Sequence, residues 1–195
     1  AIALVEPSAG GCGSPTQTVV VRIKNYSTNT LDLAINNVTV NVSATGPSAY
    51  ASNITISSGT LAPGATLDVT LPATINTTAP GAYVFNASTS ATGDGNPVND
   101  AMGQTTYTLG AGASLSGTYT VGAGGNFATL TAAVDAYNNA SCLAGNVVFE
   151  LIDPSYTTAT GETFPISIEE NPSSAMYTLT IRPAAGNAAT ITGTS

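Results

Sequence analysis

Apolar and polar residues alternate in short runs over the first half of the chain. In residues 17–26, Val19, Val21 and Ile23 alternate with Val20, Arg22 and Lys24, which is the period of a β-strand. Pro-Gly pairs in "LAPGA" and "TAPGA" mark turns between such runs. Similar runs occupy residues 31–35, 38–44, 53–57, 65–71, 81–89 and 105–109. This spacing predicts an antiparallel, immunoglobulin-like β-sandwich over residues 1–110.

The pattern changes after residue 110. Residues 111–117 are small and without periodicity, which predicts a linker. Apolar runs then return at longer intervals, at residues 146–152, 164–170, 177–183 and 189–193. Long connections between apolar strands favour parallel stacking. Residues 118–195 are therefore predicted to begin a parallel β-helix, with inward ladders that include Val148, Ile166, Leu179 and Ile191.

One segment has the period of an amphipathic α-helix. Over residues 127–139, Phe127, Leu130, Val134 and Tyr137 recur at helical spacing. The helix could be a cap over the open first coil of a solenoid, which needs such a cover. The alternative is a crossover helix in a small α+β domain. We adopt the cap, so the predicted fold is all-β apart from one helix.

Composition limits the partners of the chain. Of its 195 residues 43% are hydrophobic and only 7% charged, and the net charge is −8. Arg22, Lys24 and Arg182 are the only cations, whereas nucleic-acid binding needs several on one face. No apolar run approaches the roughly 20 residues of a membrane-spanning helix. The chain starts at Ala1 with no visible signal peptide, so we expect a processed chain or a fragment.

Catalytic chemistry finds little support in the sequence. The absence of histidine removes the usual base of a nucleophilic triad. Glycosidases need two carboxylates about 5–9.5 Å apart. Glu169 and Glu170 are neighbours on a predicted strand and would point to opposite faces, while Glu150 and Glu162 would meet only by accident of the fold. The prediction is a protein that is not an enzyme.

A calcium site is one interpretation of the loop "GDGNPVND". Its ligands would be Asp94, Asn96 and Asp100, because Ca²⁺ takes several oxygen ligands from a short loop. The other interpretation is a turn rich in Asx residues. Calcium is the only cofactor that the sequence suggests.

Seven Asn-X-Ser/Thr sequons are present, which matter only if the host glycosylates such sites. They are Asn25, Asn37, Asn41, Asn53, Asn76, Asn86 and Asn139.

The two cysteines leave their pairing open. A Cys12–Cys142 disulfide would fit an oxidising compartment, but the two residues fall in different predicted domains. The alternatives are two buried thiols, or thiols with partners elsewhere in a longer chain. A structural zinc site is excluded, because histidine and CxxC spacing are both absent.

Two resemblances cover nearly the whole chain. "VVVRIKNYSTNTLDL", "SGTLAPGATLDVTL" and "APGAYVFNASTSATGDGNPVND" resemble the CARDB-type, immunoglobulin-like adhesion module of secreted Bacteroidota proteins. "GTYTVGAGGNFATLTAAVDAYNNASCLAGNVVFELIDPSY", "ETFPISI" and "YTLTIRPAAG" are similar to the start of right-handed parallel β-helix domains in large exported surface proteins. The resemblance implies export and surface display, and no catalytic residues. Such β-helices run for many coils, so we expect an uncovered coil near Ser195.

The leading functional hypothesis is a secreted, non-catalytic structural or adhesive module of a cell-surface adhesin. Its partners would be other surface modules, copies of itself or surface glycans. One alternative is a filament subunit, assembled by strand addition of "AIALVEP" or by end-to-end stacking. Another is an accessory domain of a carbohydrate-active β-helix enzyme.

Overall fold

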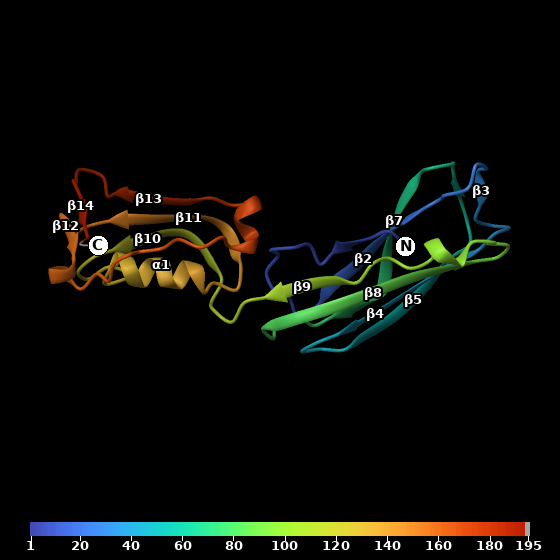
Figure 1. Cartoon of the computed structure of the whole chain (residues 1–195), viewed down its shortest axis with the longest axis horizontal. Coiled ribbons are helices and arrows are strands. Elements are labelled where there is room, and N and C mark those ends of the chain that lie inside the picture. Colours follow the sequence, from blue (N-terminus) through green and yellow to red (C-terminus); the bar gives the residue numbers. More distant parts are fainter. Residues whose placement is uncertain (194–195) are drawn as a thin grey trace. The chain divides into compact units, whose positions relative to one another are not determined.

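The computed structural model describes residues 1–193 and is mostly β-structure with one α-helix (Figure 1). The chain divides into two compact units. The first contains Ala1–Ala9 and Gly13–Leu109, and the second contains Gly10–Cys12 and the chain from Gly110 onward. Residues 10–12 thus belong with a part of the chain that follows them by about a hundred residues.

The first unit contains antiparallel sheets only. One sheet has the order β1 (Ala3–Glu6), β2 (Gln17–Lys24) and β7 (Thr66–Ile75). A second has the order β5 (Tyr50–Ile56), β4 (Val38–Thr45), β8 (Gly81–Ala91) and β9 (Thr105–Leu109). The short strands β3 (Leu31–Asp32) and β6 (Thr60–Leu61) form a separate pair, and η1 (Pro97–Asn99) is a 3-10 turn.

The apolar rows of both larger sheets form a single core. Val19 and Val21 of β2 are fully buried, and so are Val40 of β4 and Tyr83 and Phe85 of β8. The residues between them along each strand are more exposed. The period-two alternation predicted for these segments is confirmed, because each strand buries one of its two faces.

The N-terminal segment pairs within its own unit. In β1, Ala3 lies opposite Arg22 and Leu4 opposite Val21 of β2. Strand addition by "AIALVEP" to a neighbouring molecule would therefore require β1 to leave its own sheet. The N-terminal segment is therefore not free for strand addition, because β2 offers it an edge inside the same unit.

The second unit is built from parallel strands. A three-stranded sheet has the order β10 (Leu115–Val121), β11 (Leu143–Leu151) and β13 (Leu179–Pro183). A second parallel pair joins β12 (Ser155–Thr157) to β14 (Thr190–Thr192). The 3-10 turns η2 (Thr158–Thr160) and η3 (Pro172–Ala175) lie in the connections.

The register corrects the predicted inward ladder. Val147 lies opposite Leu179, whereas Val148 lies opposite Thr180. Val147 is fully buried and Val148 only half-buried, so Val147 occupies the inward row in place of Val148. The run "NVVFELI" has apolar residues at adjacent positions, so alternation cannot choose its inward face; only the pairing partner does.

Three further expectations for this unit also need correction. Residues 164–170 form no strand, and Ile166 packs against the core from an irregular segment. Ile191 does lie in a strand, but it is 47% exposed. Residues 111–117 are not wholly a linker, because β10 begins at Leu115, whose side chain is buried. The alternation around residue 166 is typical of a strand. A segment becomes a strand, however, only where a neighbouring strand is placed to pair with it, and the local pattern does not determine that.

The single helix α1 (Leu130–Asn138) connects β10 to β11, which are adjacent and parallel (Figure 1). It therefore occupies the position of a crossover helix, the alternative to the cap. Leu130, Val134 and Tyr137 are buried in one cluster with the inward residues of the sheet. Phe127 precedes the helix and packs against Phe149, with ring centroids 5.7 Å apart. Thr129 caps the helix by accepting the N–H of Ala132 at 3.0 Å.

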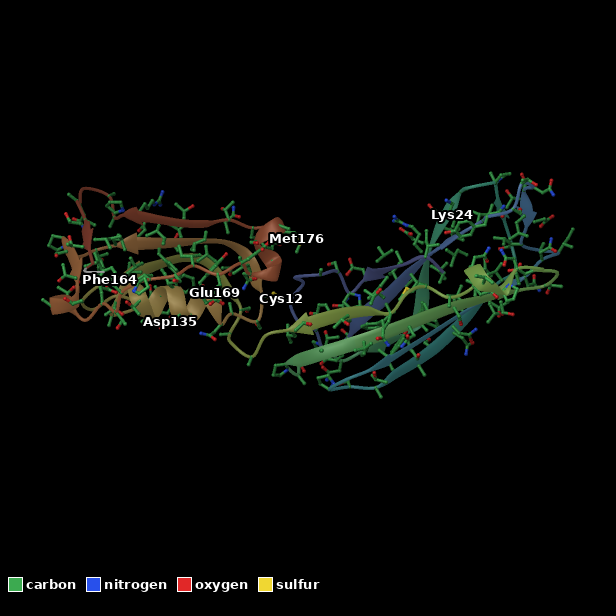
Figure 2. All side chains as sticks on the ribbon, in the orientation of Figure 1. Cys12, Lys24, Asp135, Phe164, Glu169 and Met176 are labelled. Atoms are coloured by element: carbon green, nitrogen blue, oxygen red, sulfur yellow. A yellow bond between two sulfur atoms is a disulfide. The ribbon has the colours of Figure 1, made fainter. Side chains whose placement is uncertain are left out.

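Cys12 and Cys142 form a disulfide within the second unit, with a Cα–Cα distance of 5.2 Å (Figure 2). Ser173 reinforces this connection. Its Oγ accepts the N–H of Leu143 at 3.0 Å and donates to the carbonyl oxygen of Gly10. Residues 10–12 are thus fixed to the second unit by one covalent bond and one buried side chain.

We expect a Cys12→Ser/Cys142→Ser double variant to lower the free energy of unfolding of the second unit by about 3 kcal/mol. The disulfide restricts the unfolded second unit by closing a loop. Because residues 13–109 have their own core and stay folded, the part of this loop that gains freedom in the variant is mainly residues 110–141. The chain lacks tryptophan, so urea denaturation followed by NMR would resolve the two units. The wild-type protein under reducing conditions serves as control and should match the variant. Equal destabilisation of both units would contradict this account.

Candidate functional site

The second unit has an open sheet edge at β13. Within residues 1–193, β13 pairs only with β11 and β14 pairs only with β12. Each strand thus presents one row of main-chain N–H and C=O groups that no described strand satisfies. An open parallel edge of this kind is a template for a further strand.

The apolar row becomes more exposed toward this edge. Val147 and Phe149 of β11 are fully buried, whereas Leu179 and Ile181 of β13 are only half-buried. In the other pair, Tyr156 of β12 is 2% exposed. Its partner in β14, Ile191, is 47% exposed. The inward row is therefore covered at β11 and β12 and incompletely covered at β13 and β14.

Two more apolar side chains are exposed on the segment that leads to β13. Ile168 is 55% exposed and Met176 is 52% exposed. Met176 is labelled in Figure 2. Single exposed apolar residues are ordinary. We define the open end as the incompletely covered apolar residues of the two strands with an open edge, which are Leu179, Ile181 and Ile191.

The outer face of the same sheet carries an ion pair. Glu150 and Arg182 lie opposite each other in β11 and β13, and the Arg182 Nη2–Glu150 Oε1 distance is 2.7 Å. Both side chains are partly exposed, so the pair contributes about 1 kcal/mol or less. It fits the register of β13 against β11, and it leaves Glu150 engaged with a cation.

Glu162 is a buried carboxylate at the start of the helix. Its Oε1 accepts the N–H of Leu130 at 2.7 Å, and its Oε2 accepts both the N–H of Thr131 at 2.7 Å and the Oγ1–H of Thr131 at 2.6 Å. The first N–H groups of a helix lack intrahelical partners and favour negative charge. Glu162 is thus held by helix α1 and does not face Glu150. No sequence signal indicated this role, because Glu162 lies far beyond the capped helix.

Glu169 and Glu170 are both exposed. The expectation that they point to opposite faces assumed a strand over residues 164–170. The structure contains no strand there, so that argument does not apply.

Asp153 holds the glycine-rich turn that precedes the helix. Its Oδ2 accepts the N–H of Ala123 at 2.7 Å. A Cβ atom on Gly122 would approach this carboxylate to 2.7 Å, so only glycine fits there. Tyr156 completes the anchor by donating to the carbonyl oxygen of Val121, and burial raises the pKa of its hydroxyl. Sequence reasoning missed both residues, because their partners are distant along the chain.

The three calcium candidates lie on one loop of the first unit, beyond β8. The Asp94 Oδ1 atom accepts the N–H of Asn96 at 2.9 Å, and Asn96 Oδ1 accepts the N–H of Val98. Burial and the nearby Asp94 carboxylate raise the pKa of Asp100. Across residues 1–193, no cluster of three or more His, Cys, Asp or Glu side chains has metal-binding geometry. The calcium site therefore stays a prediction, and the Asx turns are present.

Three of the sequons gather on the outer face of the four-stranded sheet. Asn41 and Asn53 lie directly opposite each other in β4 and β5, and both are exposed with Asn86 of β8. These three line a shallow groove of about 450 Å³. Asn37, Asn76 and Asn139 are also exposed.

Asn25 differs from the other sequons. It is 6% exposed, and its Nδ2 donates to the carbonyl oxygens of Asn29 and Leu61, both at 2.9 Å. A transferase cannot reach this nitrogen in the folded chain.

The comparisons with known proteins add no relative: neither a scan against protein-family models nor a search of curated proteins found a match to this chain. In the part of the chain that the structure describes, no helix is long and apolar enough to cross a membrane.

We expect Glu162→Gln to lower the free energy of unfolding of the second unit by about 1–3 kcal/mol. Glutamine would place an NH2 donor where one carboxylate oxygen now accepts, so the N–H groups of Leu130 and Thr131 would no longer each have an acceptor oxygen of their own. Chemical denaturation followed by circular dichroism measures the change. The matched control is Glu170→Gln, at an exposed position without a side-chain hydrogen bond to any described residue. Equal stability of the two variants would show that the buried carboxylate does not support the helix.

Proposed function

We propose that this chain is a secreted, non-catalytic structural and adhesive module of a cell-surface protein. In this proposal the first unit is an immunoglobulin-like, CARDB-type sandwich, and the second begins a parallel β-helix. The observation that carries the proposal is the open end of the second unit, where an inward apolar row is half-exposed beside a parallel edge that no described strand pairs with. Such an edge fits a domain built to be extended by further strands.

Two consecutive segments of the second unit stack in the same order. The segment from β11 to β12 lies beside the segment from β13 to β14, with β11 paired to β13 and β12 paired to β14. Both pairs are parallel, as successive coils of a solenoid would be. This repetition supports the β-helix interpretation and a structural role.

The engagement of the acidic side chains supports a non-catalytic role. Glu150 pairs with Arg182, Glu162 binds the helix N-terminus, and Asp153 accepts a main-chain N–H. Each of these three carboxylates would have to give up a structural contact before it could act on a substrate. The Cys12–Cys142 disulfide supports secretion, because disulfides persist mainly in oxidising compartments.

Self-association through the open end is a second candidate function. The unpaired β13 edge could accept a strand or a coil from another copy, which would build a filament by end-to-end stacking. This route leaves β1 in its own sheet, unlike strand addition by the N-terminal segment. The open end is therefore the surface on which assembly is best tested.

For the non-catalytic role, we expect the purified chain to release no reducing sugar or unsaturated product from neutral and acidic polysaccharides above the buffer background. Product assays at several pH values measure this. Turnover that disappears in a Glu150→Gln variant would overturn the proposal, since it would assign chemistry to a residue that we place in an ion pair.

For self-association, we expect the wild-type chain to form larger species as its concentration rises. Ile191→Arg should weaken this association by about tenfold or more, because it places a charge on the half-exposed row. Light scattering coupled to size-exclusion chromatography measures the mass. The matched control is Ile35→Arg in the first unit, where the side chain is 73% exposed. A wild-type chain that stays monomeric at every concentration would reject self-association. Extension of the sheet by a further part of the same protein would then be the remaining explanation of the open end.

A further inference from the structure

The first unit contains a cavity of about 630 Å³, which is within the range of small-molecule sites. Its apolar lining includes Ile23, Val38 and Leu61, all at least nine-tenths buried. These residues come from β2, β4 and β6 and belong to regular structure. The cavity thus has a rigid apolar floor.

One side of the rim is aromatic and cationic. Tyr26 lines the cavity and is 56% exposed, which is unusual for a large ring in this chain. The ammonium of Lys24 lies 4.9 Å from the centroid of the Tyr26 ring (Figure 2). This cation–π contact holds the two side chains together beside the opening.

The other side of the rim is the loop after β8. Asp94, Asn99 and Asp100 line the cavity there. The Asn99 carboxamide makes no hydrogen bond to any residue that the structure describes, and the same holds for the Tyr26 hydroxyl. The rim therefore offers hydrogen-bond donors from Lys24 and Asn99 and hydrogen-bond acceptors from the carboxylates of Asp94 and Asp100. It also offers the aromatic ring of Tyr26.

We propose that this cavity binds a neutral pyranose unit of a surface glycan. A pyranose has an apolar C–H face for the floor and the Tyr26 ring, and hydroxyl groups that both donate and accept hydrogen bonds. Asp94 and Asp100 offset the ammonium of Lys24 and the amino group of Ala1, which also lines the cavity, so the site has no excess of positive charge for a phosphate or sulfate. The inference rests on the adhesive part of the proposed function and assigns that activity to the first unit.

Calcium is the competing occupant of the loop. Asn96 Oδ1 already accepts the N–H of Val98, and Asp94 Oδ1 accepts the N–H of Asn96. A cation would have to compete with these turn contacts, whereas a sugar could use the free Asn99 carboxamide and the Tyr26 ring without disturbing them. The saccharide is therefore the occupant that this geometry favours.

The test is NMR titration of the full chain with methyl β-glucopyranoside, methyl α-mannopyranoside, methyl β-galactopyranoside and the methyl glycoside of N-acetylglucosamine. At least one should shift the amide signals of residues 24–27 and 92–100 and receive saturation transfer from the protein. Tyr26→Ala and Asn99→Ala should each weaken binding about tenfold, a loss of about 1.4 kcal/mol. Tyr26 lies on a loop and Asn99 at the end of the exposed 3-10 turn η1, so folding should be retained, and the dispersion of the other amide signals would show it.

The matched control is Val98→Ala, on the same loop. Val98 is 88% exposed and does not line the cavity, so this variant should bind as the wild type does. Absence of binding by all four glycosides would overturn the inference, as would binding that survives both rim variants. Shifts of residues 92–100 caused by calcium chloride alone, with no response to the glycosides, would assign the loop to a cation. None of these outcomes affects the stacking or turnover experiments, so the inference can fail while the structural role of the second unit stands.

Discussion

The position of β11 between two parallel neighbours is the constraint on which the second unit depends. Pairing with β10 on one side and β13 on the other sets the register of the whole sheet. Because alternate side chains point to opposite faces, this register places Val147 and Phe149 on the inward row. The parallel direction also demands a crossover between β10 and β11, which α1 supplies. In the same sheet order no strand within residues 1–193 pairs with the second edge of β13, and this edge belongs to the open end.

Burial of Glu162 links the helix to the connection that follows β12. An isolated buried carboxylate would cost several kcal/mol, but three hydrogen bonds and the positive end of the helix compensate for it. The segment around residue 162 and the first turn of α1 therefore stabilise each other. Together with the disulfide, this contact gives a small unit of parallel strands tertiary connections that its sheets alone would not provide.

In the first unit, the residues that form the core and the residues proposed to bind a ligand lie in different places. Its core rows are apolar, and the outer face of the four-stranded sheet carries uncharged groups such as Asn41 and Asn53. Amides and hydroxyls keep this surface hydrated in a chain that is only 7% charged. The Tyr26 hydroxyl and the Asn99 carboxamide, which bond to no residue that the structure describes, lie outside the strands at the cavity rim, as expected when a rigid scaffold positions variable segments. The two proposed roles thus fall on different units, with adhesion on the first and extension on the second.

The sequence by itself determined what depends on local periodicity: the alternating strands of the first unit, such as β2 and β4, and the buried face of α1. Long intervals between the later strands also indicated their parallel direction. Tertiary structure alone decided which of Val147 and Val148 faces inward, because two adjacent apolar residues leave the face open until a partner strand fixes it. It decided that residues 164–170 form no strand, and that residues 10–12 join the second unit, where Cys12 meets Cys142. These features, like the Glu162 contact, depend on residues far apart along the chain, which a local pattern cannot bring together.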